Sequence, residues 1–293
     1  MRSSSLKQTT IAEMVKEGDR AMRLKLASKS LHYSWRVCYK WRRRIAVKNL
    51  ESVYQLPGML TTHEVDCLYR LGQFNEQKGV VVEIGSWKGK STVALALGAA
   101  KVNAEKIYAI DPHRIMPEEG YLEDTEADFL ANIKQAGVED QIVPMVMTSE
   151  AAAQHWDKPI RLLWIDGDHR YEPTKLDFSL WEPHLVEGGI LAMHDTIRKN
   201  GPKRVLWENV FRSDRFQEIT IVDNITAVRK VKKASFEAKC VKALTLSTRA
   251  AYIAARKIGV PKSKEIGRTL LSRVTAQTWT RLLVFVFSAS IAR

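Results

Sequence analysis

The sequence predicts an α/β fold built on a doubly wound, mostly parallel β-sheet, and three observations lead to this expectation. Short β-branched runs alternate with helix-like segments from residue 80 onward, which is the rhythm of βαβ units. The first run, 80–84, is almost wholly apolar, as expected for a strand covered on both faces. Ionisable residues cluster directly after several runs, at the sheet edge where open parallel sheets bind their ligands.

The individual elements follow from turn and capping signals. Thr61 and Glu64 have the spacing of a capping box for a helix that runs to about Phe74. Gly188-Gly189 is expected to turn the chain into the fifth strand. The other helices are expected at 91–100, 124–136, 148–156, 173–185 and 203–211. The strands are expected at 80–84, 106–110, 141–147, 161–165 and 190–193, followed by a hairpin of 216–222 and 225–231.

Charge is distributed unevenly over the 293 residues, which carry a net charge of +13. Residues 1–50 hold 13 Lys/Arg against 3 Asp/Glu, and residues 230–293 hold 14 against 2, so the middle has a net charge of −9. A uniformly basic nucleic-acid enzyme would not show this pattern. Three widely spaced cysteines indicate neither a disulfide framework nor a cysteine zinc site, and no apolar run reaches the ~20 residues of a membrane span. We therefore expect a cytoplasmic protein.

The turn after the first strand has the composition of a ligand-binding turn. Gly85 and Gly89 bracket it, and a helix N-terminus with unpaired N–H groups follows. The spacing is one residue short of a P-loop, and Trp87 and Lys90 break the dinucleotide pattern. What remains places Glu83 where it can accept hydrogen bonds from a cationic or hydroxylated ligand. The alternative is a glycine turn that only connects a strand to a helix.

Acidic residues and histidines follow the second, fourth and fifth strands. Asp111 ends the second strand, where doubly wound folds hold ribose hydroxyls, although an Asp before Pro112 also suits a simple turn. The sequence Asp166-Gly167-Asp168-His169 follows the fourth strand, and His194-Asp195-Thr196 follows the fifth. In parallel strands these ends meet at one edge of the sheet. The alternative for Asp166 and Asp168 is a role as capping or turn residues.

Over residues 80–196 the motifs together resemble the class I S-adenosylmethionine (SAM)-dependent methyltransferases. The set comprises Glu-Ile-Gly-Ser, Ile-Asp-Pro, Ile-Asp-Gly-Asp-His-x-Tyr and Gly-Gly-x-x-x-x-His-Asp. It is most similar to the metal-dependent sugar and macrolide O-methyltransferases of the mycinamicin and macrocin type, with their cephalosporin hydroxylase-like relatives. The resemblance implies a Rossmann-like sheet of seven strands with a C-terminal antiparallel hairpin. It also implies a SAM site formed by Glu83, Gly85, Ser86, Gly89, Asp111, Thr148 and Ser149.

The same resemblance implies a divalent cation, Mg²⁺ or Mn²⁺, at the ends of the fourth and fifth strands. Asp166, His194 and Asp195 would hold the cation, and His169 would act as general base beside Asp166. His194 stands where the macrolide enzymes have an acid. A histidine suits Mn, Fe or Zn better than Mg²⁺, which prefers oxygen. An imidazole, whose ordinary pKa is about 6.5, can take a proton from a hydroxyl at neutral pH.

The function predicted from these residues is SAM-dependent O-methylation of a hydroxyl on a sugar, glycolipid or related natural product. One alternative is a SAM-binding or scaffold module without turnover, which His194 in place of an acid favours. Another is a nucleic-acid-associated methyltransferase. No Asn/Asp-Pro-Pro-Tyr-like motif follows the fourth strand, so nucleic acid is the less favoured partner.

Two basic helical arms, 1–55 and 234–293, are predicted to flank the catalytic domain at 56–233. Aromatic and basic residues alternate over 33–44, and a short apolar patch lies at 279–287. This composition suits peripheral docking on an anionic membrane that carries a lipid-linked sugar acceptor. The alternatives are arms that pack against each other or across a homo-oligomer, and binding to RNA.

Overall fold

The computed structural model describes residues 50–114 and 123–257. Most of the predicted N-terminal arm and the apolar patch at 279–287 lie outside the described residues. The membrane-docking hypothesis therefore stays a prediction. No helix in the described part of the chain is long and apolar enough to cross a membrane.

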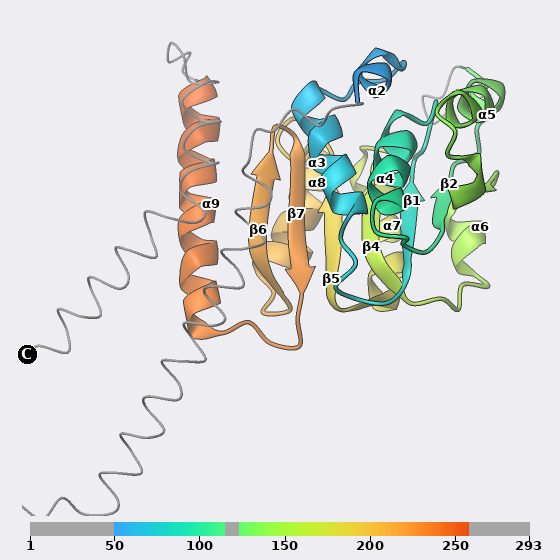
Figure 1. The fold of residues 1–293 in the computed structure, drawn as a ribbon. Helices are drawn as coiled ribbons and strands as arrows, with labels where there is room; N and C mark the ends of the chain where they lie inside the picture. Colours follow the sequence, from blue (N-terminus) through green and yellow to red (C-terminus); the bar gives the residue numbers. More distant parts are fainter. Residues whose placement is uncertain (1–49, 115–122, 258–293) are drawn as a thin grey trace, which may run out of the picture. The chain divides into compact units, whose positions relative to one another are not determined.

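A seven-stranded sheet forms the centre of the fold, in the order β3-β2-β1-β4-β5-β7-β6 (Figure 1). The first five strands pair in parallel, and β7 runs antiparallel to both of its neighbours. The predicted fold class, including the C-terminal antiparallel hairpin, is therefore confirmed. The strands are β1 Val80–Ile84, β2 Ile107–Ile110, β3 Ile142–Met145, β4 Ile160–Ile165, β5 Leu185–Met193, β6 Phe216–Val222 and β7 Ile225–Lys230.

Helices cover the two faces of the sheet. In Figure 1, α3 and α4 lie over one face, while α7 and α8 lie behind the strands. All residues of β1 and β4 are buried, because these strands are central and covered on both faces. The helices are α2 Glu51–Gln55, α3 Thr62–Gly72, α4 Lys90–Ala100, α5 Glu126–Gln135, α6 Ser149–Ala153, α7 Tyr171–Trp181, α8 Asn200–Val205 and α9 Phe236–Lys257.

Around the fifth strand, two predictions differ from the structure. The helix after β4 ends at Trp181, followed by a short 3₁₀ turn at Glu182–His184, rather than continuing to residue 185. Gly188-Gly189 is not a turn into the strand, because β5 already begins at Leu185 and runs through both glycines. Gly188 has a left-handed φ of 81°, and its carbonyl accepts a hydrogen bond from the Arg229 side chain on β7. This bend within the strand resembles a turn when only the sequence is read.

The helix α9 belongs to the predicted C-terminal arm, yet it packs on the sheet domain. The buried Lys242 Nζ donates hydrogen bonds to the carbonyls of Val210, Ser213 and Phe216. About two turns further on, Arg249 is also buried and donates to the carbonyl of Thr196, just after the end of β5. Burial lowers the pKa of both basic groups. Two of the basic residues of this arm therefore serve as internal hydrogen-bond donors.

Candidate active site

The predicted site residues come together at the carboxyl ends of β1, β2, β4 and β5. The strand order reverses direction between β1 and β4, since β2 and β3 lie on one side of β1 while β5 lies beyond β4. Ligands of open α/β sheets bind at such a reversal. The sequence predicted this edge correctly, because the position follows from parallel pairing alone.

The glycine turn is shaped by the neighbouring strand as well as by any ligand. Gly85 has a left-handed φ of 85°, and a Cβ there would overlap the backbone carbonyl of Asp166. The backbone N–H of Asp166 donates to the Ile84 carbonyl at 2.8 Å, which holds the two strand ends together. Gly89, also at φ 85°, is the N-cap residue of α4. The backbone after β4 therefore requires a glycine at position 85. The sequence alone had suggested that a bound ligand required it.

Glu83 lies within β1 and is completely buried. Thr92 Oγ1 on α4 donates a hydrogen bond to Glu83 Oε2 at 2.5 Å. Burial raises the pKa of Glu83 to about 8, and it outweighs the opposing effect of the Ser91 and Thr92 hydroxyls. The second carboxyl oxygen, Oε1, is buried with no hydrogen-bond partner among the described residues. The predicted contact between Glu83 and a ligand stays a prediction.

Asp111 organises the backbone around the second strand end. Its Oδ2 accepts a hydrogen bond from Trp87 N at 2.9 Å, and its Oδ1 accepts one from His113 N at 2.8 Å. His113 is buried, with Nδ1 2.9 Å from Thr125 Oγ1 and Nε2 3.4 Å from Ser86 Oγ. Asp111 therefore acts as a turn residue whatever else it binds. His113 was missed by sequence reasoning, and its only signal was its place two residues after Asp111.

Thr148 and Ser149, the residues predicted near the adenine, both make contacts within the protein. Thr148 is the N-cap of α6, and its Oγ1 accepts from Ala151 N at 3.3 Å, as the capping pattern predicted. Ser149 Oγ accepts from the Trp181 indole at 2.8 Å. Their predicted contacts with a cofactor stay predictions.

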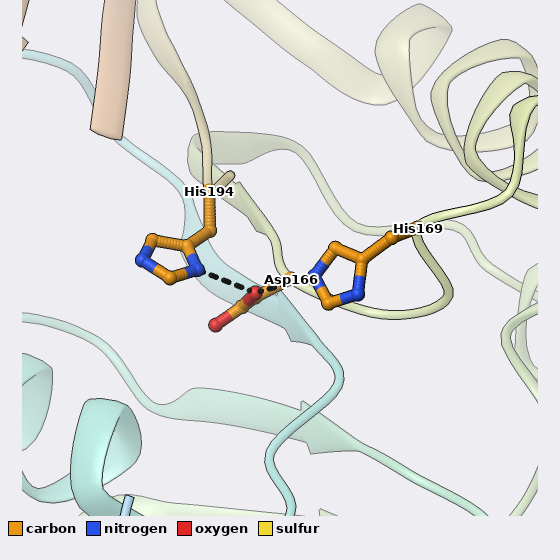
Figure 2. Close-up of side chains that lie close together, drawn as sticks. All are labelled: Asp166, His169 and His194. Carbon is orange, nitrogen blue, oxygen red and sulfur yellow. Dashed lines mark ion pairs between the residues drawn. The ribbon is translucent and has the colours of Figure 1, made fainter. Parts of the chain in front are cut away.

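Four side chains after β4 and β5 form an Asp–His cluster consisting of Asp166, His169, His194 and Asp195 (Figure 2 shows the first three). His194 Nδ1 lies 3.1 Å from Asp166 Oδ1. His169 Nε2 lies 3.6 Å from Asp166 Oδ1 and 3.4 Å from Asp195 Oδ2. This Nε2 atom is buried without a hydrogen-bond partner among the described residues. Two imidazoles and two carboxylates thus converge, with His194 at the position where the resemblance implied an acid.

Asp168, the other acid of this loop, points away from the cluster. Its Oδ1 accepts from Arg170 N at 2.7 Å, and its Oδ2 pairs with the Arg170 guanidinium. Burial raises the pKa of Asp168, but the Arg170 contacts outweigh it and leave the pKa below its usual range. Asp168 is thus a turn residue, which is one of the two roles that the alternative reading of the loop described, while the N-cap of α7 is Arg170.

His194 lies between the buried carboxylate of Glu64 and the partly buried carboxylate of Asp166. Its Nδ1 faces Asp166, and its Nε2 lies 3.4 Å from Glu64 Oε1 on α3. Burial lowers the pKa of His194, but the two carboxylates outweigh it and raise the pKa to about 10. The pKa of Asp166 is lowered, because His194 and His169 outweigh the effect of its burial. Sequence reasoning missed the Glu64 contact, because it recognised Glu64 only as a capping residue.

Asp195 has a left-handed φ of 50°, which is uncommon for a residue with a side chain. The following residue is tightly held: Thr196 N and Oγ1 both donate to the Asn224 carbonyl in the β6–β7 turn, at 3.1 and 2.9 Å. Arg249 of α9 donates to the Thr196 carbonyl. These contacts stabilise a backbone shape that presents Asp195 to His169.

The cluster has the donor atoms that a divalent cation requires. One oxygen of Asp166 and one nitrogen each of His169 and His194 lie within 4.8 Å of one another. The unpartnered His169 Nε2 also fits an added ligand. Asp195 is outside this group of three but borders it through His169.

A family model described as "Methyltransferase domain" matches residues 82–196, the span that contains the glycine turn and the whole Asp–His cluster. This segment is a methyltransferase domain. The predicted recognition of a class I SAM-dependent methyltransferase is thereby confirmed for the domain. The matched segment 82–196 does not include α3, which contributes Glu64, or α9, which contributes Arg249.

Known proteins resemble the methyltransferase domain and its surroundings at low identity. The O-methyltransferase NovP shares the fold, with a TM-score of 0.51 and 16% identity, over 57% of this chain and 79% of NovP. An O-methyltransferase from Bacillus cereus, solved in complex with SAH, aligns with a TM-score of 0.48 and 18% identity over 68% of this chain and 100% of its own. Uncharacterized protein R132 of Acanthamoeba polyphaga mimivirus is 28% identical over 128 residues, or 42% of this chain. That alignment spans 53% of R132, about half the length of this curated relative.

Proposed function

We propose that the protein transfers the methyl group of SAM to a hydroxyl oxygen of a sugar, glycolipid or related natural product. The Asp–His cluster is the observation that supports this proposal most strongly. It presents His169 Nε2 as a buried nitrogen that has no hydrogen-bond partner in the described part of the chain and lies 3.6 and 3.4 Å from two carboxylates, next to the glycine turn of a methyltransferase domain. An imidazole in that position suits proton abstraction from a hydroxyl acceptor.

The chemistry requires a base because a sugar or alcohol hydroxyl has a pKa far above 7. SAM, when bound, supplies a methyl carbon on a sulfonium, so that an O–C bond forms as the C–S bond breaks and S-adenosylhomocysteine leaves. His169 Nε2 takes the hydroxyl proton. The carboxylates of Asp166 and Asp195, 3.6 and 3.4 Å away, then stabilise the imidazolium that results.

A divalent cation is part of the proposal, with Asp166, His194 and Asp195 as the residues that would hold it. When bound, such an ion would lower the pKa of the acceptor hydroxyl and orient the acceptor. The convergence of the Asp166 and His194 donor atoms supports this assignment.

The test uses the full-length chain, labelled SAM, and a panel of sugars, glycolipids and small phenols. His169→Ala should lower the transfer rate by about 10²–10⁴-fold and leave SAM affinity in calorimetry unchanged, since a base acts only in the transition state. His155→Ala is the matched control. His155 is exposed and lies in the connection that enters the opposite end of β4, so its loss should change neither quantity. Equal losses in both variants would refute the assignment of His169.

A SAM-binding module without turnover is the second candidate function. The favouring observation is His194, whose ring faces Asp166 and Glu64 and offsets their negative charge. Tight SAM binding with no labelled product from any acceptor, including RNA, would support the module. Labelled RNA would instead support the nucleic-acid alternative, and full activity in excess EDTA would remove the cation from the proposal.

Docking on an anionic membrane remains a proposal for the arms. Flotation with liposomes should depend on anionic lipid and disappear when residues 1–49 and 258–293 are removed. This truncation retains α9, because Lys242 and Arg249 make its packing part of the domain. A full-length protein that stays at the bottom of the gradient as a folded oligomer would indicate that the arms mediate self-association.

A further inference from the structure

Glu64 is connected to the Asp–His cluster although it lies outside the matched methyltransferase domain. It is completely buried near the start of α3. Its Oε2 accepts a hydrogen bond from Thr61 N at 2.8 Å, which completes the capping box. Its Oε1 accepts from Asn224 N at 2.9 Å and lies 3.4 Å from His194 Nε2. Only the first of these contacts is needed to cap the helix.

The His194 ring is fixed from both sides. Its backbone N–H donates to the Ile165 carbonyl at 3.0 Å, so the residue still belongs to the sheet edge. The ring packs beside the buried Trp164 indole, with 5.8 Å between the two ring centroids. Nε2 faces Glu64, and the opposite nitrogen, Nδ1, faces Asp166 Oδ1 at 3.1 Å. The side of His194 that is turned toward the cluster is therefore Nδ1.

We propose that Glu64 is the positioning residue that makes His194 a nitrogen ligand through Nδ1, so that the site selects a transition-metal ion over Mg²⁺. This inference rests on the proposed cation-assisted function and deepens it by naming the class of ion. A histidine ligand is commonly oriented by a carboxylate on its other nitrogen, which fixes the tautomer and makes the ligating nitrogen more basic. Glu64 Oε1 faces His194 Nε2 at the ion-pair distance of 3.4 Å, and this nitrogen makes no hydrogen bond within the described residues.

The donor set explains the selectivity. Mg²⁺ prefers an octahedral shell of oxygens, whereas imidazole nitrogen suits Zn²⁺ and the other later first-row transition-metal ions, which include Co²⁺. Among the residues proposed to hold the ion, Asp166 and Asp195 offer oxygen, and His194 offers a nitrogen that lies 3.1 Å from Asp166 Oδ1. A site of this composition should bind Co²⁺ or Zn²⁺ far more tightly than Mg²⁺. Carboxylate ligands alone would not discriminate in this direction.

Glu64→Gln and Thr61→Ala form a matched pair of variants. Glutamine keeps the shape of Glu64 but removes the charge that faces His194 Nε2. Thr61→Ala removes the other half of the same capping box, where Thr61 Oγ1 accepts from Glu64 N at 3.2 Å. It also removes the hydrogen bond that Thr61 Oγ1 donates to Asp223 Oδ2 at 2.8 Å, and it keeps the Glu64 carboxylate that faces His194. Both variants weaken the start of α3, so a loss seen only in Glu64→Gln reports on His194.

The measurement is direct titration of the unlabelled full-length protein with CoCl₂, followed by visible absorption, and by calorimetry with and without excess MgCl₂. Wild-type protein should give the spectrum of nitrogen-ligated Co²⁺, resistant to Mg²⁺. Glu64→Gln should lower Co²⁺ affinity about 10–100-fold, while Thr61→Ala should stay within about twofold of wild type. Unchanged Co²⁺ affinity in Glu64→Gln, or displacement of Co²⁺ from wild-type protein by equimolar Mg²⁺, would overturn the inference.

The wild-type competition with Mg²⁺ needs no variant, so it decides the selectivity even if Glu64→Gln does not fold. The result is also separable from methyl transfer. Co²⁺ binding that depends on Glu64, in a protein that methylates no acceptor, would refute the proposed enzymatic function and support the metal assignment. Methyl transfer that persists in EDTA, with no Co²⁺ binding, would support the proposed enzymatic function and refute the metal assignment.

Discussion

Replacing Glu83 by glutamine should change how the stability of the protein depends on pH. Burial raises the pKa of Glu83 to about 8, from an ordinary value near 4.5. A carboxyl whose pKa is raised on folding contributes stability below its unfolded pKa, and this contribution is lost as the pH rises through the folded pKa. For Glu83 the loss runs from about pH 4.5 to about pH 8. Glutamine imitates the protonated carboxyl and does not ionise, so the variant should not show this loss.

The magnitude follows from the two pKa values. At about 1.36 kcal/mol per pH unit, the gap corresponds to an upper limit on the order of 5 kcal/mol between pH 4.5 and pH 9. The amide oxygen of the introduced glutamine can still accept the Thr92 hydroxyl hydrogen bond, which Glu83 accepts at 2.5 Å. The Glu83→Gln variant should therefore gain several kcal/mol relative to wild type as the pH rises.

Urea unfolding of both proteins at pH 5, 7 and 9, followed by circular dichroism, measures this difference without added SAM. Glu150→Gln is the control, because Glu150 is exposed in the first turn of α6 and its replacement should shift stability by no more than about 0.5 kcal/mol at any pH. If the free-energy difference between Glu83→Gln and wild type is the same at pH 5 and pH 9, the reasoning about Glu83 is wrong.

Two further stability predictions concern the glycine turn and α9. Gly85→Ala should lower the free energy of unfolding by more than about 3 kcal/mol, since a left-handed φ costs about 1–2 kcal/mol and the added Cβ also meets the Asp166 backbone. Gly137→Ala is the control, because Gly137 has φ 64° and open space around it, so this variant should lose only the cost of the left-handed φ, about 1–2 kcal/mol. Equal losses in urea unfolding would contradict this. Lys242→Met should cost about 2–3 kcal/mol, because its buried ammonium donates to three backbone carbonyls, of which that of Val210 keeps Ser213 N as a second donor. Loss of the more exposed Lys239 should cost less than about 1 kcal/mol. A neutral Lys242→Met would show that α9 adds little to the domain.

The conformation around Asp195 connects the methyltransferase domain to the rest of the chain. Thr196 is held by the β6–β7 turn through Asn224 and by α9 through Arg249. The same turn donates its Asn224 N–H to Glu64. Elements on both sides of the 82–196 segment therefore support one end of the Asp–His cluster, and the geometry of the cluster depends on more of the chain than the matched domain.

The sequence by itself determined the features that depend on neighbouring residues. Strand and helix order followed from apolar runs and caps, and the Thr61–Glu64 capping box is present as predicted because both hydrogen bonds span three residues. The β6–β7 hairpin followed from the Asp223-Asn224 turn. Parallel pairing also required the acids after β4 and β5 to meet at one edge, so Asp166 and Asp195 could be placed together without a structure.

Only the tertiary structure decided which partners these residues have. Glu64 and His194 lie 3.4 Å apart although 130 positions separate them in the sequence, and the capping pattern of Glu64 gave no sign of that second contact. Likewise, the neighbour that excludes a side chain at Gly85 is the backbone of Asp166 on a different strand. Local patterns fix backbone conformation through short-range hydrogen bonds and sterics. The pKa of a buried group depends instead on charges brought within a few ångströms by the packing of distant segments.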